Sequence, residues 1–233
     1  MDGKASPRFG AVERGGVLKL VGILLLMGGL LFWPAGTLDW PAAWWMVASF
    51  LLGILASLLY LWRANPEIFA ARARVAADTE RWDYVFVALA MLGFFGVLPV
   101  AGFDHRFGWS QTPVGVIVLG DLMILLGTAV TAWAQGVNRH FEPTVRIQSD
   151  RGHRVVDTGP YAIVRHPGYI AGSVMIAGMA LGLGSLWALL PALGAAATLI
   201  GRTIFEERTL RAGLPGYADY MTRVRFRWLP GLW

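Results

Sequence analysis

Apolar runs of about 20 residues recur along this chain, and they constrain its fold more than any other feature. A helix needs about 20 mostly apolar residues to cross the hydrocarbon core of a bilayer. Such runs occupy residues 17–36, 41–62, 82–102 and 113–135, and residues 169–205 could form two helices with a turn at GLGSLW. We therefore predict an all-α, polytopic transmembrane bundle of about six spans. Five spans would result if the first run lay along the membrane surface.

A secretory signal peptide is the other interpretation of the first run. It is less favoured because Trp33 and Pro34 stand where a small-residue cleavage site would be needed. At the start of the last long run and within it, Gly168, Gly172, Gly178 and Gly182 would allow helices to approach each other closely.

Composition excludes several classes of protein. Of the residues 56% are hydrophobic and 15% are charged, whereas soluble domains have about 45–50% apolar and about 25% charged residues. This excludes a disordered chain and an ordinary soluble enzyme. The chain has no cysteine, which excludes disulfides, cysteine-ligated zinc and a cysteine nucleophile. The net charge of +5 fits basic cytoplasmic loops better than a nucleic-acid partner.

Basic residues alternate regularly between the predicted loops. Of the 20 Lys and Arg residues, all but Arg106 fall in segments that six spans place on one side. The positive-inside rule makes that side cytoplasmic, with both termini inside.

Two polar segments and one buried acid are candidates for function. Segment 63–81 is either an amphipathic interfacial helix or a lid over a lipid-accessible site. Segment 136–168 is far longer than a linker needs to be and holds three of the four His residues, which favours a functional segment. The alternative interpretation is an Arg-rich loop that only binds anionic lipid head groups. Asp121 lies inside the fourth run, where we expect a hydrogen bond to another helix or partial solvation.

The absence of several known motifs argues against further classes of binding site and enzyme. The chain has no Gly-rich phosphate loop, no HExxH and no GxSxG elbow. Its four His residues show no recurring ligand spacing, so we expect no metal site. A transporter is disfavoured because polar residues avoid the middle of the spans, where transport sites lie.

The C-terminal half resembles the isoprenylcysteine carboxyl methyltransferase family, and its bacterial integral-membrane members in particular. The resemblance rests on VRIQ (145–148), RGHRVV (151–156), GPYAIVRHPGYIAG (159–172), RTIFEERTL (202–210) and the tail from residue 215, in this order. It is strong over residues 138–233 and weaker back to residue 63. Phospholipid N-methyltransferases share the RHPxY motif, and membrane sterol reductases that use NADPH have a related architecture.

The resemblance implies S-adenosylmethionine as cofactor in a cytoplasmic pocket, a lipophilic acceptor that enters from the bilayer, and a bacterial inner membrane. It divides the chain into a lipid-substrate region, residues 1–135, and a methyltransferase region, residues 136–233. The implied cofactor-binding residues are Gln148, His153, Val155, Gly159, Tyr161, His166, Pro167, Tyr169, Glu206 and Glu207, and the implied catalytic residues are Arg165, Arg202 and Glu206.

Physical chemistry suggests a role for several of these groups. Glu206 or Glu207 suits the ammonium of the cofactor, and Arg165 suits its carboxylate. A carboxylate acceptor would need no base, and Arg202, held by Glu206 four residues on, would orient it. An amine acceptor would need Glu206 or Glu207 as base. The alternatives are therefore a phospholipid or amine N-methyltransferase, an NADPH-dependent reductase, and a non-catalytic membrane protein.

Overall fold

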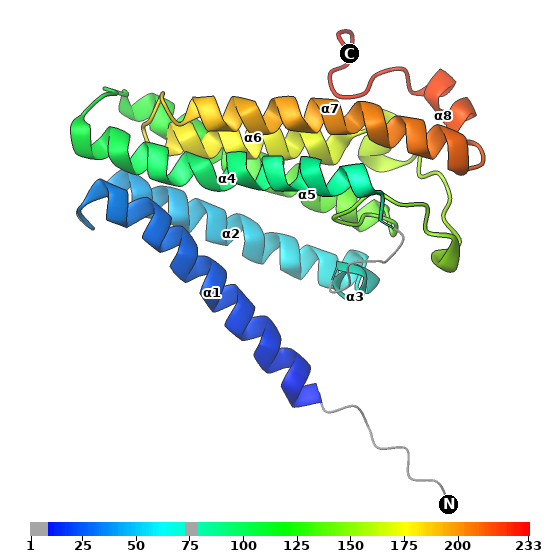
Figure 1. Ribbon diagram of the computed structural model, residues 1–233, viewed down its shortest axis with the longest axis horizontal. Coiled ribbons are helices and arrows are strands. Elements are labelled where there is room, and N and C mark those ends of the chain that lie inside the picture. Colours follow the sequence, from blue (N-terminus) through cyan, green and yellow to red (C-terminus); the bar gives the residue numbers. More distant parts are fainter. Residues whose placement is uncertain (1–8, 73–78) are drawn as a thin grey trace, which may run out of the picture.

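The computed structural model describes residues 9–72 and 79–233, and six long helices dominate this part of the chain (Figure 1). They are α1 (Phe9–Ala35), α2 (Pro41–Ala64), α4 (Arg81–Phe107), α5 (Val114–Val137), α6 (Pro167–Gly182) and α7 (Leu189–Gly213). Two short helices, α3 (Glu67–Arg72) and α8 (Tyr217–Arg223), and two 3-10 turns, Ser149–Arg151 and Gly159–Ala162, complete them. The described residues contain helices and loops but no strand, which confirms the all-α prediction.

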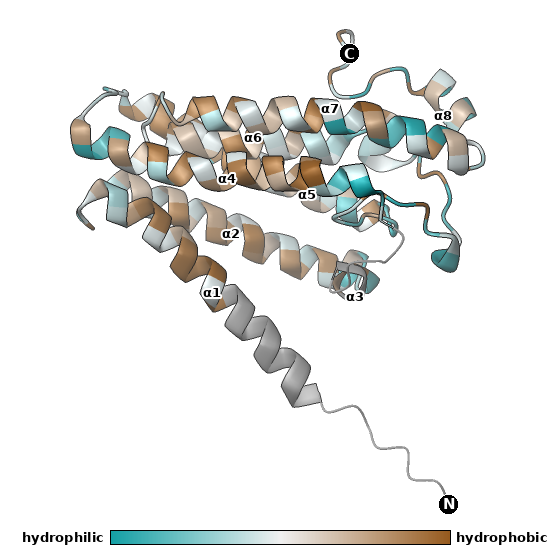
Figure 2. Ribbon diagram, in the orientation of Figure 1, coloured by the Kyte–Doolittle hydropathy of each residue, from teal (hydrophilic) through white to brown (hydrophobic). Residues whose placement is uncertain are grey.

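Four of the described helices, α2, α4, α5 and α7, are long and apolar enough to cross a membrane. The apolar part of α1, Val21–Ala35, and the helix α6 are shorter, so a count of six spans stays a prediction. Apolar residues fill the middle of the bundle, and hydrophilic residues are dense at the end that bears α3 and α8 (Figure 2). This distribution is that of a polytopic bundle.

The predicted turn between the last two long helices is confirmed. Helix α6 ends at Gly182 and α7 begins at Leu189, and Gly184 adopts a φ of +73° in the turn. The Ser185 hydroxyl donates to Asp104 Oδ2 at 2.5 Å, and the Ser110 amide and hydroxyl each donate to the same carboxylate at 2.7 Å. Asp104 therefore joins the α4–α5 loop to the α6–α7 turn.

Glycines bring α5 and α6 into backbone contact. A Cβ on Gly120 would lie 2.1 Å from the Gly182 amide nitrogen, and one on Gly178 would lie 2.7 Å from the Gly120 carbonyl oxygen. Close approach is thus confirmed at Gly178 and Gly182, and Gly168 lies against the Phe141 ring. The expectation for Gly172 is wrong, because a Cβ there would meet open space.

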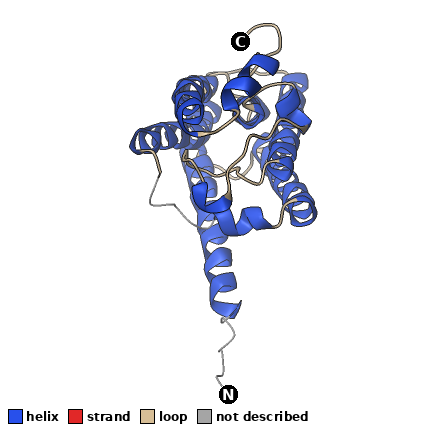
Figure 3. Ribbon diagram, turned by 90° about the vertical axis from the view of Figure 1, so that its right-hand side faces the viewer, coloured by secondary structure: helices blue, strands red, loops and turns tan. Residues whose placement is uncertain are grey.

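The segment between α5 and α6 folds across one end of the bundle. Viewed from that end, its loops lie in the middle, with helices around them (Figure 3). In the polar segment 63–81, α3 forms a short helix over Glu67–Arg72, and residues 73–78 lie outside the described residues. At the level of the bundle core, Asp121 of α5 lies near Ser49 of α2, but its Oδ1 is buried and has no hydrogen-bond partner among the described residues, so the hydrogen bond expected for that acid stays a prediction.

Candidate functional site

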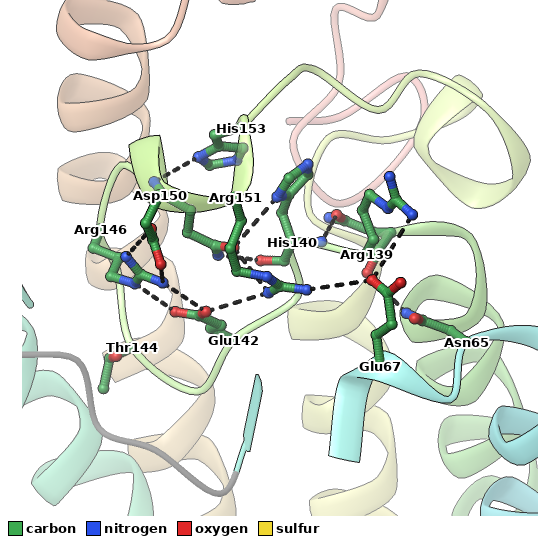
Figure 4. Close-up of polar contacts among 12 residues, drawn as sticks. Asn65, Glu67, Arg139, His140, Glu142, Thr144, Arg146, Asp150, Arg151 and His153 are labelled. Atoms are coloured by element: carbon green, nitrogen blue, oxygen red, sulfur yellow. Dashed lines mark hydrogen bonds and ion pairs between the residues drawn. The ribbon is translucent and has the colours of Figure 1, made fainter. Parts of the chain in front are cut away.

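The loop after α5 is built around a buried arginine (Figure 4). Arg146 donates from Nε to Glu142 Oε2 at 2.8 Å and from Nη1 to Asp150 Oδ1 at 2.8 Å. Arg151 adds a bond to Glu142 Oε1 at 3.4 Å. The Arg146 and Glu142 side chains are each only 6% exposed. Their pairing in a low-dielectric site holds the loop in one conformation, because a lone buried charge would be costly.

Two histidines lie side by side next to this ion pair. The rings of His140 and His153 lie 4.6 Å apart, and Gln148 joins them. The backbone N–H of Gln148 donates to His153 Nδ1 at 3.3 Å. Its side-chain Nε2 donates to the His140 backbone carbonyl at 2.7 Å, and its side-chain Oε1 lies 3.3 Å from His140 Nδ1. Burial lowers the pKa of His140, and burial followed by the neighbouring His140 lowers the pKa of His153 to about 4. Both rings are therefore neutral near pH 7.

The hydrogen bonds of His140 leave one ring atom available to a ligand. A neutral imidazole has one donor and one acceptor nitrogen. Since His140 Nδ1 faces a carbonyl-type oxygen of Gln148, Nδ1 is the donor and Nε2 the acceptor. His140 Nε2 is buried and has no hydrogen-bond partner among the described residues.

The two acids on α7 have different environments, and Glu207 is the one that is fully paired. Its Oε1 accepts from Arg165 Nε at 2.6 Å and lies 3.2 Å from His166 Nε2, and its Oε2 accepts from Arg227 Nε at 2.8 Å. The Glu207 and Arg165 side chains are each 4% exposed. The Arg165 guanidinium also donates from Nη1 to the Val224 carbonyl at 2.6 Å. Glu207 therefore joins α6, α7 and the tail into one structure.

Glu206 is the accessible member of the pair. Its Oε2 accepts from the Tyr169 hydroxyl at 2.5 Å and lies 3.7 Å from His166 Nδ1. Its side chain remains 21% exposed. The Tyr169 ring stacks on His166 with ring centres 5.4 Å apart. Glu206 thus keeps a face open to a cationic ligand, whereas Glu207 does not.

Arg202 does not make the contact that its spacing suggested. Nε and Nη2 of Arg202 bind Asp83 Oδ1 and Oδ2 at 2.6 and 2.9 Å, and Nη2 also donates to the Pro143 carbonyl at 2.8 Å. Asp83 is 0% exposed and accepts a further bond from the Val145 amide. The expectation that Glu206 holds Arg202 is therefore wrong. A bidentate pairing with a buried carboxylate outcompetes an i,i+4 contact on the helix surface.

Further tyrosines, Tyr161 and Tyr217, lie near Glu206. The Asn138 amide donates to the Tyr161 hydroxyl at 3.2 Å, and the Tyr220 hydroxyl donates to the Tyr161 carbonyl at 2.8 Å. The Tyr217 hydroxyl is buried without a hydrogen-bond partner in the described part of the chain. Burial, followed by the charges of Glu207 and Glu206, raises the pKa of Tyr217. Its phenol stays protonated and can donate to a ligand.

The structure places the predicted residues in two neighbouring groups. The first group consists of Arg165, His166, Tyr169, Glu206 and Glu207 around the acid pair. The second consists of Gln148 and His153. Gly159 lies against Trp133 and Val137, and Pro167 is the first residue of α6. Val155 packs against the buried apolar residues in and beside α8, which are Leu214, Tyr217, Tyr220 and Val224. Tyr161 lies near the first group, because its pKa is raised mainly by burial and further by the nearby Glu206 charge.

Sequence reasoning missed four residues: Asp83, His140, Tyr217 and Arg227. His140 lay inside the segment singled out for its histidines, so its position was a usable indication. Tyr217 and Arg227 belong to the spaced Tyr and Arg residues of the tail that the family resemblance includes, but neither was assigned a role. Asp83 is 119 positions from its partner, and nothing local could have indicated it.

Comparison with known proteins gives one family match. Residues 116–214 match the family model described as phospholipid methyltransferase. The match covers α5, the loop with both histidines, α6 and α7, so it includes both groups of the candidate site. No curated protein matches the chain. The chain is therefore similar to a family of membrane methyltransferases, and the match does not single out the isoprenylcysteine-specific branch.

Proposed function

We propose that the protein is an S-adenosylmethionine-dependent membrane methyltransferase that acts on a lipophilic acceptor, with a carboxylate as the favoured acceptor group. The observation that carries the proposal is the family match over residues 116–214. The segment contains the RHPxY motif and the acid pair, which face each other across α6 and α7. Residues 136–233 would form the methyltransferase region, and residues 1–135 would face the lipid substrate.

The chemistry of the site fits this cofactor. When bound, S-adenosylmethionine supplies an electrophilic methyl group on a sulfonium. Glu206 is a partly exposed carboxylate that suits the ammonium of the cofactor. The buried acceptor His140 Nε2 and the buried donor Tyr217 hydroxyl lack partners in the described residues; they suit an amino or hydroxyl group and a carboxylate. The rings of Tyr161 and Tyr169 suit a cation.

The residues of this chain would mainly position reactants and exclude water. Methyl transfer needs reacting atoms about 3–3.5 Å apart and aligned, and a carboxylate acceptor needs no base. Arg165, which already pairs with Glu207, would shape the pocket rather than bind the cofactor carboxylate. Arg202 lies over the Tyr169 ring, with its Cζ 5.3 Å from the ring centre, and would hold that ring in place.

A phospholipid or amine N-methyltransferase is the second candidate, and the description of the matching family favours it. Deprotonating an amine requires a base, and Glu206 is the accessible carboxylate. A carboxylate acceptor, by contrast, would not depend on Glu206 as a base.

Thermal unfolding of the detergent-purified protein tests the proposal. A ligand at 100 times its dissociation constant adds about 2.7 kcal/mol of stability. We expect S-adenosylmethionine and S-adenosylhomocysteine to raise the Tm and NADPH to leave it unchanged. Glu206→Gln should keep the Tm of the free protein but lose most of the ligand-induced rise. Stabilisation by NADPH alone would replace the proposal with a reductase.

A further inference from the structure

A groove between α2 and α5 opens on the outer surface of the bundle. It has a volume of about 360 Å³. Its floor is formed where the two helices touch, because a Cβ on Gly53 would lie 2.5 Å from Thr128 Oγ1. Its walls include Ala56, Tyr60, Ala129 and Trp133. Since both helices are candidate membrane spans, the groove faces the bilayer.

The interior of the groove is apolar even where its residues carry hydroxyls. The Ser57 hydroxyl donates to the Gly53 carbonyl at 2.7 Å, and the Thr128 hydroxyl donates to the Ile124 carbonyl at 2.9 Å. Both groups are therefore satisfied within their own helices and offer little to a polar ligand. A hydrocarbon chain is the matching occupant.

One end of the groove has polar donors. A second hollow that shares Ala56 and Tyr60 continues along α2 to Arg63. Here the Tyr60 hydroxyl, the Trp133 indole and the Arg63 guanidinium all lie near the last turns of their helices. All three are hydrogen-bond donors and one is cationic, which suits an anionic head group at the membrane interface.

The donor end adjoins the candidate site. Trp133 Nε1 lies 3.3 Å from the position of a Cβ on Gly159, which begins the 3-10 turn that contains Tyr161. Asn138, directly after α5, donates to the Tyr161 hydroxyl. The head group of a chain in the groove would therefore lie next to the loop that carries the proposed cofactor residues.

We propose that the α2–α5 groove binds one hydrocarbon chain of an anionic amphiphile, a long-chain carboxylate, with its head at Arg63, Tyr60 and Trp133. A volume near the lower end of the ~300–1,000 Å³ range of ligand pockets suits one chain rather than two. The inference rests on the proposed function in one respect, which is that this amphiphile is the methyl acceptor. Binding itself does not depend on methyl transfer.

Photolabelling of the full-length protein in detergent tests the groove. The probe is hexadecanoic acid with a diazirine in mid-chain, and the labelled peptides are identified by mass spectrometry. We expect labelling to concentrate in α2 and α5 and to be competed by unlabelled hexadecanoate. Ala56→Trp and Ala129→Leu, which fill the groove, should each lower it at least threefold. Ala48→Trp, at an exposed position on α2 outside the groove, is the matched control and should not.

Arg63→Gln tests the head group. It should lower labelling by the acid at least threefold and leave labelling by the corresponding alcohol unchanged. Labelling spread evenly over the outward faces of α1, α4 and α7, or equal loss with Ala48→Trp, would overturn the proposal, as would preferential competition by a two-chain phospholipid. The rise in Tm with S-adenosylhomocysteine is measured on the same samples. If that rise is absent while groove labelling persists, the proposed function fails and the groove stands.

Discussion

At the scale of single residues, the two adjacent glutamates on α7 have different roles, one structural and one accessible to a ligand. Glu207 neutralises Arg165 and Arg227 in a buried cluster, and Glu206 keeps an open face. Adjacent positions on a helix differ by about 100°, so one acid is turned toward the core and its neighbour stays partly exposed. The difference between the two lies in burial and partners, not in residue type.

Glu207→Gln is expected to destabilise the protein by about 3–5 kcal/mol, because it leaves the buried Arg165 without its counter-charge. Chemical denaturation in mild detergent, compared with wild type, measures the loss. Glu206→Gln serves as the control, with an effect below about 1 kcal/mol. Equal losses in both variants would show that the two acids are not divided as described.

The Asp83–Arg202 pair marks the limit of what residue patterns can predict. The sequence placed Arg202 on the correct helix and next to the correct site. Its partner could not be predicted, because Asp83 belongs to α4 and the two meet only when α4 packs against α7. By contrast, the proximity of the 165–169 motif to the acid pair followed from a motif order that the family resemblance supplied.

At the scale of elements, the long helices were the most predictable part of the molecule. The thickness of a bilayer sets helix length, so apolar runs alone gave α2 and α5 to within two residues at each end. Helix α4 continues to Phe107, beyond the predicted end at residue 102, because Asp104 finds hydrogen-bond partners in Ser110 and Ser185. The contact between α5 and α6 could not be predicted, because it depends on which glycines face each other.

Gly120→Ala is expected to destabilise the protein by several kcal/mol, because the new Cβ would collide with the α6 backbone. Gly172→Ala, on the neighbouring helix, is the control. Its Cβ meets open space, so it should be neutral or stabilise by up to about 1 kcal/mol. Denaturation curves of the two variants and the wild type measure these changes in the free energy of unfolding. A tolerated Gly120→Ala would contradict the close backbone packing.

The histidine pair of the loop after α5 predicts how stability depends on pH. Burial lowers the pKa of His153 to about 4, whereas an unfolded histidine titrates near 6.5. The unfolded chain therefore binds more protons between these values, and stability falls as the pH drops from about 6.5 toward 4. The Tm of the wild type should decline more steeply over this range than that of His153→Phe. Parallel curves would mean that His153 does not titrate differently on folding.

At the scale of the whole molecule, the bundle has two unlike ends. One end carries the candidate site, α3 and α8, and the other consists of short turns joined by Asp104. All but one of the basic residues fall in segments that a six-span topology would place on one side of the membrane, the side of the candidate site, so the positive-inside rule predicts that the site faces the cytoplasm. There it would have access to a soluble cofactor, while the groove between α2 and α5 faces the bilayer.

Single-cysteine labelling can test this orientation cleanly, because the natural chain has no cysteine. Ser149→Cys places a thiol on the exposed loop at the site end, and Gln111→Cys places one in the exposed turn between α4 and α5. We expect a membrane-impermeant maleimide to label Gln111→Cys in intact cells and to label Ser149→Cys only after the membrane is permeabilised. The opposite pattern would place the site outside the cytoplasm, away from the compartment where the proposed cofactor is made, and would argue against the proposed function as well as the topology.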